Sequence, residues 1–248
     1  MLRFGIRHRL RRLGLYPQIP AQRGWMPFLS RVAWMFWSVG CRLGPISKVG
    51  VAIQPLPRQW AERFLADIDA APPATIMAED HAPGYVSEAK PQELAHLNRV
   101  NEYREVTPGL LRTLGEFLEA NRMDIDRLLG HRWRVSSVRQ FYLRPFDQQG
   151  GRHTDGWPLA IRKLFILPRG ATPETGTTWF ELIGGRELLI DEPHPLWMIF
   201  ENSRVRHALT PGQVPRPTIE LNIVPARRTS TEPRYAGING WYPLFPWH

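Results

Sequence analysis

The chain has 248 residues, of which 43% are hydrophobic and 11% aromatic, so it is long and apolar enough to bury a core without disulfides or a structural metal. Its single cysteine, Cys41, excludes an intramolecular disulfide and a cysteine-rich zinc site, which favours a reducing, cytoplasmic compartment. The net charge of +9 comes entirely from residues 1–50, which hold nine basic residues and no acid. Residues 51–248 are formally neutral, which disfavours a nucleic-acid channel over them.

Residues 1–50 form a basic, aromatic N-terminal arm. Residues 1–15 place arginines among Leu, Phe and Ile at near-helical spacing, and residues 28–39 are apolar but interrupted by Arg31. Neither stretch reaches the ~20 apolar residues that a spanning helix needs, and neither has the pattern of a secretory signal. Three interpretations stay open: a helical extension packed on the rest of the chain or on a second subunit, peripheral membrane contact through the basic and aromatic residues, and a mitochondrial-type presequence.

Residues 51–130 are expected to form a helical region that supports the core. Apolar residues recur at helical intervals in 57–68 and in 107–120, where Thr107 before Pro108 is typical of a helix N-cap and first turn. Between these segments, residues 71–92 are rich in Ala, Pro and Gly and are expected to form a loop.

Residues 131–248 are expected to form a mainly β core that ends in an aromatic tail. Short β-branched or aromatic segments, mostly separated by Gly or Pro, predict strands at 135–143, 161–167, 177–183, 187–190, 196–200 and 218–224. This spacing predicts an antiparallel sandwich or jelly roll, and therefore an α+β, mainly β chain with the helical region packed on the jelly roll. The mouth of such a barrel commonly holds a metal and a small ligand.

Two imidazoles and one carboxylate stand out as a ligand set. His153 and Asp155 lie on one face if their segment is extended, and His207 follows a predicted strand that could pair back against it. Two histidines and one carboxylate leave three open positions on an octahedral iron(II), which oxygen activation requires. The H-x-D pattern alone is weak evidence in a chain with eight histidines.

Further residues could bind an acidic co-substrate or a substrate. The planar guanidinium of Arg216 can hold a carboxylate in bidentate fashion, and the hydroxyl of Thr218 points the same way along an extended strand. Tyr142 and Lys163 are additional candidates for that carboxylate, although a strand residue with its polar end in solvent is an equally good interpretation of each. Trp157 could line a substrate pocket or pack in the core or a lid.

These residues resemble the iron(II)- and 2-oxoglutarate-dependent dioxygenases, whose pattern is H-x-D, a distant H, and R-x-S/T about ten residues later. The resemblance covers about residues 133–226, and residues 176–180 (GTTWF) are similar to the "GGxTxF" segment of the prolyl-hydroxylase-like branch, without its second glycine. It implies a double-stranded β-helix. It also implies iron(II) on His153, Asp155 and His207, with 2-oxoglutarate on Arg216 and Thr218.

The resemblance further implies that O2 is consumed and succinate and CO2 are released, with hydroxylation as the expected outcome and desaturation left open. Asp155 disfavours a halogenase, in which a small residue replaces the carboxylate. Asn222 stands where the nucleic-acid demethylases of the superfamily carry a second arginine, so nucleic acid is not an expected partner.

An alternative from another class is a non-catalytic jelly-roll binding module, docked to a membrane or polymer by the basic arm and the aromatic tail at 240–247. If the chain is an enzyme, the basic arm favours a membrane-proximal anionic substrate such as a glycolipid or polysaccharide precursor. A small molecule and a peptide residue stay open as substrates, and so does the oligomeric state.

Overall fold

The computed structural model describes residues 44–73, 101–130, 133–145, 152, 162–202, 204–210 and 212–225. Most of the basic arm, the loop predicted within 71–92 beyond residue 73, and the aromatic tail lie outside these residues. Among the described residues, no helix is long and apolar enough to cross a membrane.

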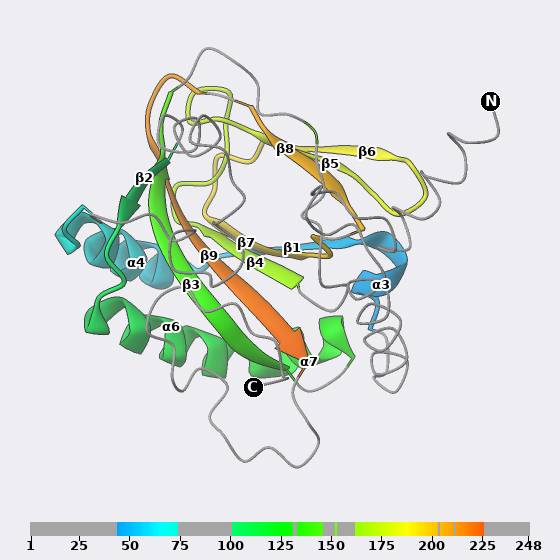
Figure 1. Cartoon of the computed structure of the whole chain (residues 1–248), viewed down its shortest axis with the longest axis horizontal. Coiled ribbons are helices and arrows are strands. Elements are labelled where there is room, and N and C mark those ends of the chain that lie inside the picture. Colours follow the sequence, from blue (N-terminus) through cyan, green and yellow to red (C-terminus); the bar gives the residue numbers. More distant parts are fainter. Residues whose placement is uncertain are drawn as a thin grey trace, which may run out of the picture.

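Six antiparallel strands form the larger sheet (Figure 1). Their order across the sheet is β1-β7-β4-β9-β3-β2. The bounds are β1 Val51–Pro55, β2 Asn101–Arg104, β3 Trp133–Leu143, β4 Arg162–Leu167, β7 Leu196–Phe200 and β9 Arg216–Pro225. Neighbours that are distant in the chain, such as β4 and β9, place residues from the two ends of the predicted core side by side.

Three antiparallel strands form the smaller sheet in the order β6-β5-β8. Their bounds are β5 Thr178–Glu181, β6 Glu187–Ile190 and β8 Arg206–Leu209. Figure 1 shows this sheet on one side of the larger sheet and the longer helices on the other. The two sheets enclose an apolar interior to which Phe165, Met198 and Phe200 of the larger sheet and Phe180 of the smaller sheet contribute.

The helices cover the outer face of the larger sheet. They are α3 Ile46–Val49, α4 Arg58–Ala70, α6 Pro108–Ala120 and α7 Arg122–Leu129. Phe117 of α6 packs edge-on against Trp197 of β7 at 5.9 Å between ring centroids, and against Phe64 of α4 at 5.5 Å. All three side chains are almost fully buried, and burial of an aromatic or large aliphatic side chain contributes about 1.5–3 kcal/mol. The helical layer therefore holds the larger sheet from behind.

The predicted helix at 107–120 is confirmed with its cap. The Thr107 hydroxyl accepts a hydrogen bond from the Leu110 amide at 3.2 Å, and Pro108 occupies the first helical position. The predicted strands are also observed, with shifts of a few residues at their ends.

Two strands, β1 and β2, lie inside the region that was expected to be helical. Both stand at an edge of the larger sheet in the part of the chain that the structure describes. β1 ends in Gln54 and Pro55, and β2 reads Asn-Glu-Tyr-Arg, so neither has the continuous apolar pattern of a buried strand. Their pairing with β7 and β3 determines their structure, and a local pattern cannot reveal it.

The strand β9 separates the two sides of the larger sheet by strict alternation. Ile219, Leu221 and Ile223 belong to the cluster packed under the helices. The intervening side chains of Arg216, Thr218 and Glu220 point to the interior between the sheets, and each is 2% exposed or less. A row of polar side chains thus runs through an otherwise apolar interior.

Candidate metal and carboxylate site

His207 lies on β8 and faces the interior. It is paired with Phe180 of β5, and its side chain is 5% exposed. Its ring packs against Phe200 at 5.0 Å and Phe180 at 6.3 Å between centroids. Aromatic walls on two sides fix the ring plane, so the imidazole is oriented before any ligand binds.

The backbone also orients this imidazole. Nδ1 of His207 lies 3.3 Å from the carbonyl oxygen of Val205. This contact fits the tautomer in which Nδ1 carries the proton and donates it to the carbonyl, so that Nε2 holds the lone pair. Metal-binding histidines are commonly oriented in this way by a backbone carbonyl. His207 is thus suited to binding a metal through Nε2.

Arg216, at the start of β9, is fully buried. Its Nη1 donates hydrogen bonds to the carbonyl oxygen of Gly176 at 2.5 Å and to the hydroxyl of Thr178 at 3.4 Å. Among the residues that the structure describes, Nε and Nη2 have no hydrogen-bond partner. Burial lowers the pKa of Arg216 to about 10, so the guanidinium remains a cation at neutral pH.

The two nitrogens without a partner lie on one edge of the guanidinium plane. Nε and Nη2 present parallel N–H groups, which match the two oxygens of a carboxylate in bidentate geometry. A buried cation with two of its three nitrogens unsatisfied costs several kcal/mol unless an anion pairs with it. The Arg216 side chain therefore has the geometry and the electrostatics of a carboxylate-binding group.

Thr218 and Gly176 complete the surroundings of this guanidinium. Thr218 lies on the same face of β9, two residues on from Arg216; it is 1% exposed, and its hydroxyl donates to the Arg216 carbonyl at 3.5 Å. Gly176 has φ +94°, and a Cβ there would approach the Thr210 carbonyl oxygen to 2.6 Å. Glycine therefore allows the chain to bring its carbonyl to Nη1 of Arg216.

The strand β5 relates His207 to Arg216. Thr178, which contacts Arg216, and Phe180, which packs on His207, both point inward from β5. Two residues along a strand span about 7 Å. The imidazole and the guanidinium thus contact neighbouring inward positions of one strand, a separation that a five-carbon dicarboxylate can bridge.

The other two predicted metal ligands, His153 and Asp155, lie outside the described residues, as does Trp157. In the part of the chain that the structure describes, no group of three His, Cys, Asp or Glu side chains could hold a metal. The assignment of all three residues stays a prediction from the sequence.

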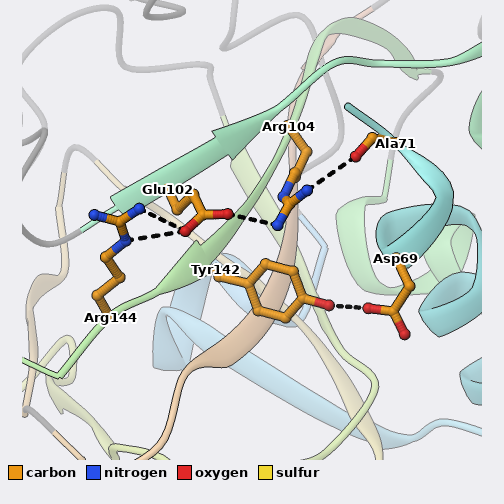
Figure 2. Close-up of polar contacts among 6 residues, drawn as sticks. All are labelled: Asp69, Ala71, Glu102, Arg104, Tyr142 and Arg144. Atoms are coloured by element: carbon orange, nitrogen blue, oxygen red, sulfur yellow. Dashed lines mark hydrogen bonds and ion pairs between the residues drawn. The ribbon is translucent and has the colours of Figure 1, made fainter. Parts of the chain in front are cut away.

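Tyr142 does not share a face with Arg216, and its prediction as a contact of the same carboxylate is corrected. In the β3–β9 register Leu143 pairs with Arg216, so Tyr142 pairs with Pro217 and points to the opposite side of the sheet. Its hydroxyl donates to the carboxylate of Asp69 in α4 (Figure 2). Burial first, and then this hydrogen bond, raises the pKa of Tyr142 to about 12.

Lys163 faces the interior but binds a different group from the one predicted. Its Nζ lies 2.9 Å from one oxygen of the Glu220 carboxylate, and Nη2 of Arg139 lies 2.7 Å from the other. Lys163 pairs with Asn222, six residues along β9 from Arg216, which corresponds to about 20 Å. Burial raises the pKa of Glu220, but the charges and hydrogen bonds of Arg139 and Lys163 outweigh it, so the pKa lies below its ordinary value.

Sequence reasoning missed the residues that hold the guanidinium and the buried carboxylate. Thr178 and Gly176 lie in the segment that resembles "GGxTxF", which was the available signal for them. Glu220 had no local signal, because its partners Lys163 and Arg139 come from other strands.

No protein-family model matches the sequence, and no curated protein matches it. Solved structures do match. An oxidoreductase of the 2OG-Fe(II) oxygenase family from Burkholderia pseudomallei is 13% identical with a TM-score of 0.52; the match covers 78% of this chain and 89% of that chain. HygX from Streptomyces hygroscopicus, with nickel, 2-oxoglutarate and hygromycin B bound, is 8% identical with a TM-score of 0.50 over 79% and 93% of the two chains.

A prolyl-4-hydroxylase from Pseudomonas putida is also similar, at 15% identity and a TM-score of 0.47 over 73% and 96% of the two chains. The first two matches span most of both chains with TM-scores of 0.50 or more, so they establish the fold. The resemblance indicated by the H-x-D, H and R-x-T residues is thus confirmed at the level of fold: the chain has the fold of the 2-oxoglutarate- and iron(II)-dependent oxygenases.

Proposed function

We propose that the chain is an iron(II)- and 2-oxoglutarate-dependent oxygenase on a jelly-roll, or double-stranded β-helix, scaffold, and that it hydroxylates its substrate. The observation that carries the proposal is the buried guanidinium of Arg216, whose Nε and Nη2 lack partners among the described residues. The shared fold with oxygenases of this kind supports the same proposal.

Each described site residue has a definite part in this proposal. The Nε–Nη2 edge of Arg216 binds the distal carboxylate of 2-oxoglutarate, and the Thr218 hydroxyl adds a hydrogen bond from the same face of β9. Thr178 and the Gly176 carbonyl hold Nη1, which keeps the free edge of the guanidinium turned away from them. The full burial of the guanidinium keeps water away from it, which strengthens the charged contact.

The imidazole of His207 would hold the metal together with His153 and Asp155. The burial of His207 and the contact of its Nδ1 with a backbone carbonyl fit such a role. Iron(II) with 2-oxoglutarate and O2 would supply the oxidising chemistry that converts a C–H bond of the substrate into C–OH, with release of succinate and CO2. Trp157 stays a proposed substrate contact.

The test is the absorption spectrum of the protein with iron(II) and 2-oxoglutarate without oxygen. A weak visible charge-transfer band is expected for the wild type, and its loss is expected in His207→Ala. His194→Ala, which removes an exposed histidine, is the matched control and should keep the band. A wild-type protein without the band, and without succinate formation upon admission of oxygen, would rule out the oxygenase and favour the binding module.

A further inference from the structure

Arg152 precedes His153 in the chain and lies on the outer face of the smaller sheet. The carbon at the centre of its guanidinium lies 3.9 Å from the centroid of the Trp179 ring, well within the range of a cation–π contact. Trp179 is on β5, and its neighbours in that strand, Thr178 and Phe180, point inward, so the indole points outward. Trp179 is nevertheless only 5% exposed, as expected of a ring covered by a stacked guanidinium.

A carboxylate connects the two stacked side chains. Nη1 of Arg152 lies 3.3 Å from one oxygen of Glu187 on β6, and the indole N–H of Trp179 donates to the other oxygen at 3.1 Å. The ion pair alone is weak because both side chains are about half exposed. Together with the stacking, it closes a cluster of three side chains that determines where the Arg152 side chain lies.

The backbone of Arg152 is held separately. Nη2 of Arg206 donates to the Arg152 carbonyl oxygen at 3.3 Å, and Nη1 of Arg206 binds Glu181 of β5 at 3.0 Å. That carbonyl belongs to the peptide group that joins Arg152 to His153. Arg206 in turn directly precedes His207 in β8. The residue that accepts this hydrogen bond, Arg152, is thus followed by the predicted metal ligand His153, and the residue that donates it, Arg206, is followed by the predicted metal ligand His207.

We propose that Arg152 is a positioning residue that anchors the start of the His153–Asp155 segment against the strand that carries His207. Its side chain is held on Trp179 and Glu187, and its carbonyl is held by Arg206. The inference rests on the proposed function, because it gives Arg152 the task of limiting where two metal ligands can lie. Such supporting residues commonly change metal affinity about 10- to 100-fold when they are removed.

Cobalt(II), which does not oxidise readily, is a suitable probe, with the dissociation constant measured by calorimetry on the full chain. Arg152→Gln is expected to weaken cobalt binding about 10- to 100-fold, while the half-exposed position leaves the melting temperature nearly unchanged. Arg152→Lys keeps a cation over the indole and should retain most of the affinity. Glu187→Gln breaks the same cluster more mildly and should give a smaller loss.

The matched control is Arg58→Gln, because Arg58 is also an exposed arginine in an ion pair, with Glu62 on α4. It should bind cobalt like the wild type. In metal-free protein, amide hydrogen exchange around residue 152 should be faster in Arg152→Gln and unchanged in Arg58→Gln, a readout that requires no metal.

Two outcomes overturn the inference in distinguishable ways. If His207→Ala loses cobalt binding but Arg152→Gln binds it as tightly as the wild type, the metal site stands and Arg152 does not position it. If the wild type binds no cobalt, or His207→Ala binds it equally well, the proposed metal site fails, and the role of Arg152 fails with it.

Discussion

Replacing Arg216 with methionine should stabilise the ligand-free protein and abolish tight binding of 2-oxoglutarate. Methionine is of similar length and apolar, so it can fill the same buried space without a charge. Replacement of a residue with a structural role lowers the free energy of unfolding of the protein. Replacement of a residue whose buried charge is neutralised only by a ligand should instead raise the stability of the ligand-free protein and weaken ligand binding. These opposite signs make the substitution informative.

The magnitude follows from the burial of the guanidinium. Its pKa falls from 12.5 to about 10, and the difference, about 2.5 pH units, corresponds to about 3 kcal/mol of disfavoured charge. Methionine removes this cost but also loses the hydrogen bond to the Gly176 carbonyl, worth about 1 kcal/mol. The ligand-free variant should therefore be about 2 kcal/mol more stable than the wild type.

Binding of 2-oxoglutarate should change in the other direction. Loss of a buried bidentate contact with a charged group costs about 3 kcal/mol or more, and each 1.4 kcal/mol is about a tenfold change, so the dissociation constant should rise at least roughly 100-fold. Urea denaturation without ligand measures the first effect. Calorimetry of 2-oxoglutarate binding to the cobalt-loaded protein measures the second.

Arg162 provides the matched control for Arg216. It is also buried, but its Nη2 lies 2.7 Å from the carboxylate of Glu201, which is itself fully buried. Arg162→Met breaks that ion pair and should destabilise the protein by about 3 kcal/mol. If Arg216→Met destabilised the ligand-free protein to the same extent, Arg216 would be a structural residue, and the argument for a carboxylate site would be refuted.

Two further predictions concern titratable groups. Glu220→Gln should lower the free energy of unfolding by about 3 kcal/mol near neutral pH, because it removes the buried negative charge that pairs with the Lys163 ammonium group. The pKa of Glu220 is lowered, so its contribution is present above the ordinary carboxyl range and is lost as the pH falls through the folded-state pKa; denaturation curves of the two proteins should converge in acid. Tyr142 should ionise at about pH 12 by ultraviolet absorbance, and Asp69→Asn should lower that value; an unchanged value would exclude the contact with Asp69.

Much of the fold could be predicted because local patterns and the final packing agree. The cap at Thr107 and the apolar spacing after it are sufficient to start and sustain α6. The alternation of β9 is equally clear, since Ile219 and Leu221 leave Arg216 and Thr218 on the opposite face. Those two residues could therefore be assigned to one face before their surroundings were known.

The face of Tyr142 could not be predicted in this way. Phe141 and Tyr142 are adjacent aromatic residues, so the sequence does not say which of them points inward. The register with β9 decides it, and an irregularity between Val135 and Ser137 changes the phase of β3 partway along the strand. A shift of one residue would reverse every side chain, which is why the location of Tyr142 required the structure.

The surroundings of Lys163 could not be predicted from the sequence for another reason. All six residues of β4 are buried, so the strand shows no polar and apolar alternation from which a face could be inferred. Its partner Glu220 is on β9, and only the pairing of the two strands brings the charges together. A buried ion pair between distant segments has no signature within either of them.

The short strand β5 shows how one segment can serve both halves of the proposed site. Its inward residues are Thr178, which holds Arg216, and Phe180, which packs on His207. Its outward residues are Trp179, on which Arg152 stacks, and Glu181, which binds Arg206. Successive residues thus contact Arg216, Arg152, His207 and Arg206, which are the proposed co-substrate anchor, the proposed positioning residue, the proposed metal ligand and the residue that precedes it.

This arrangement makes the proposed function depend on the register of β5. Because strand side chains alternate between faces, a slip of one residue would turn the indole inward against His207 and expose the Thr178 hydroxyl on the outer face. The carboxylate anchor and the support for Arg152 would then be lost together. Pairing with β6 on one side and β8 on the other fixes this register, and the left-handed Gly176 sets the point from which the strand begins.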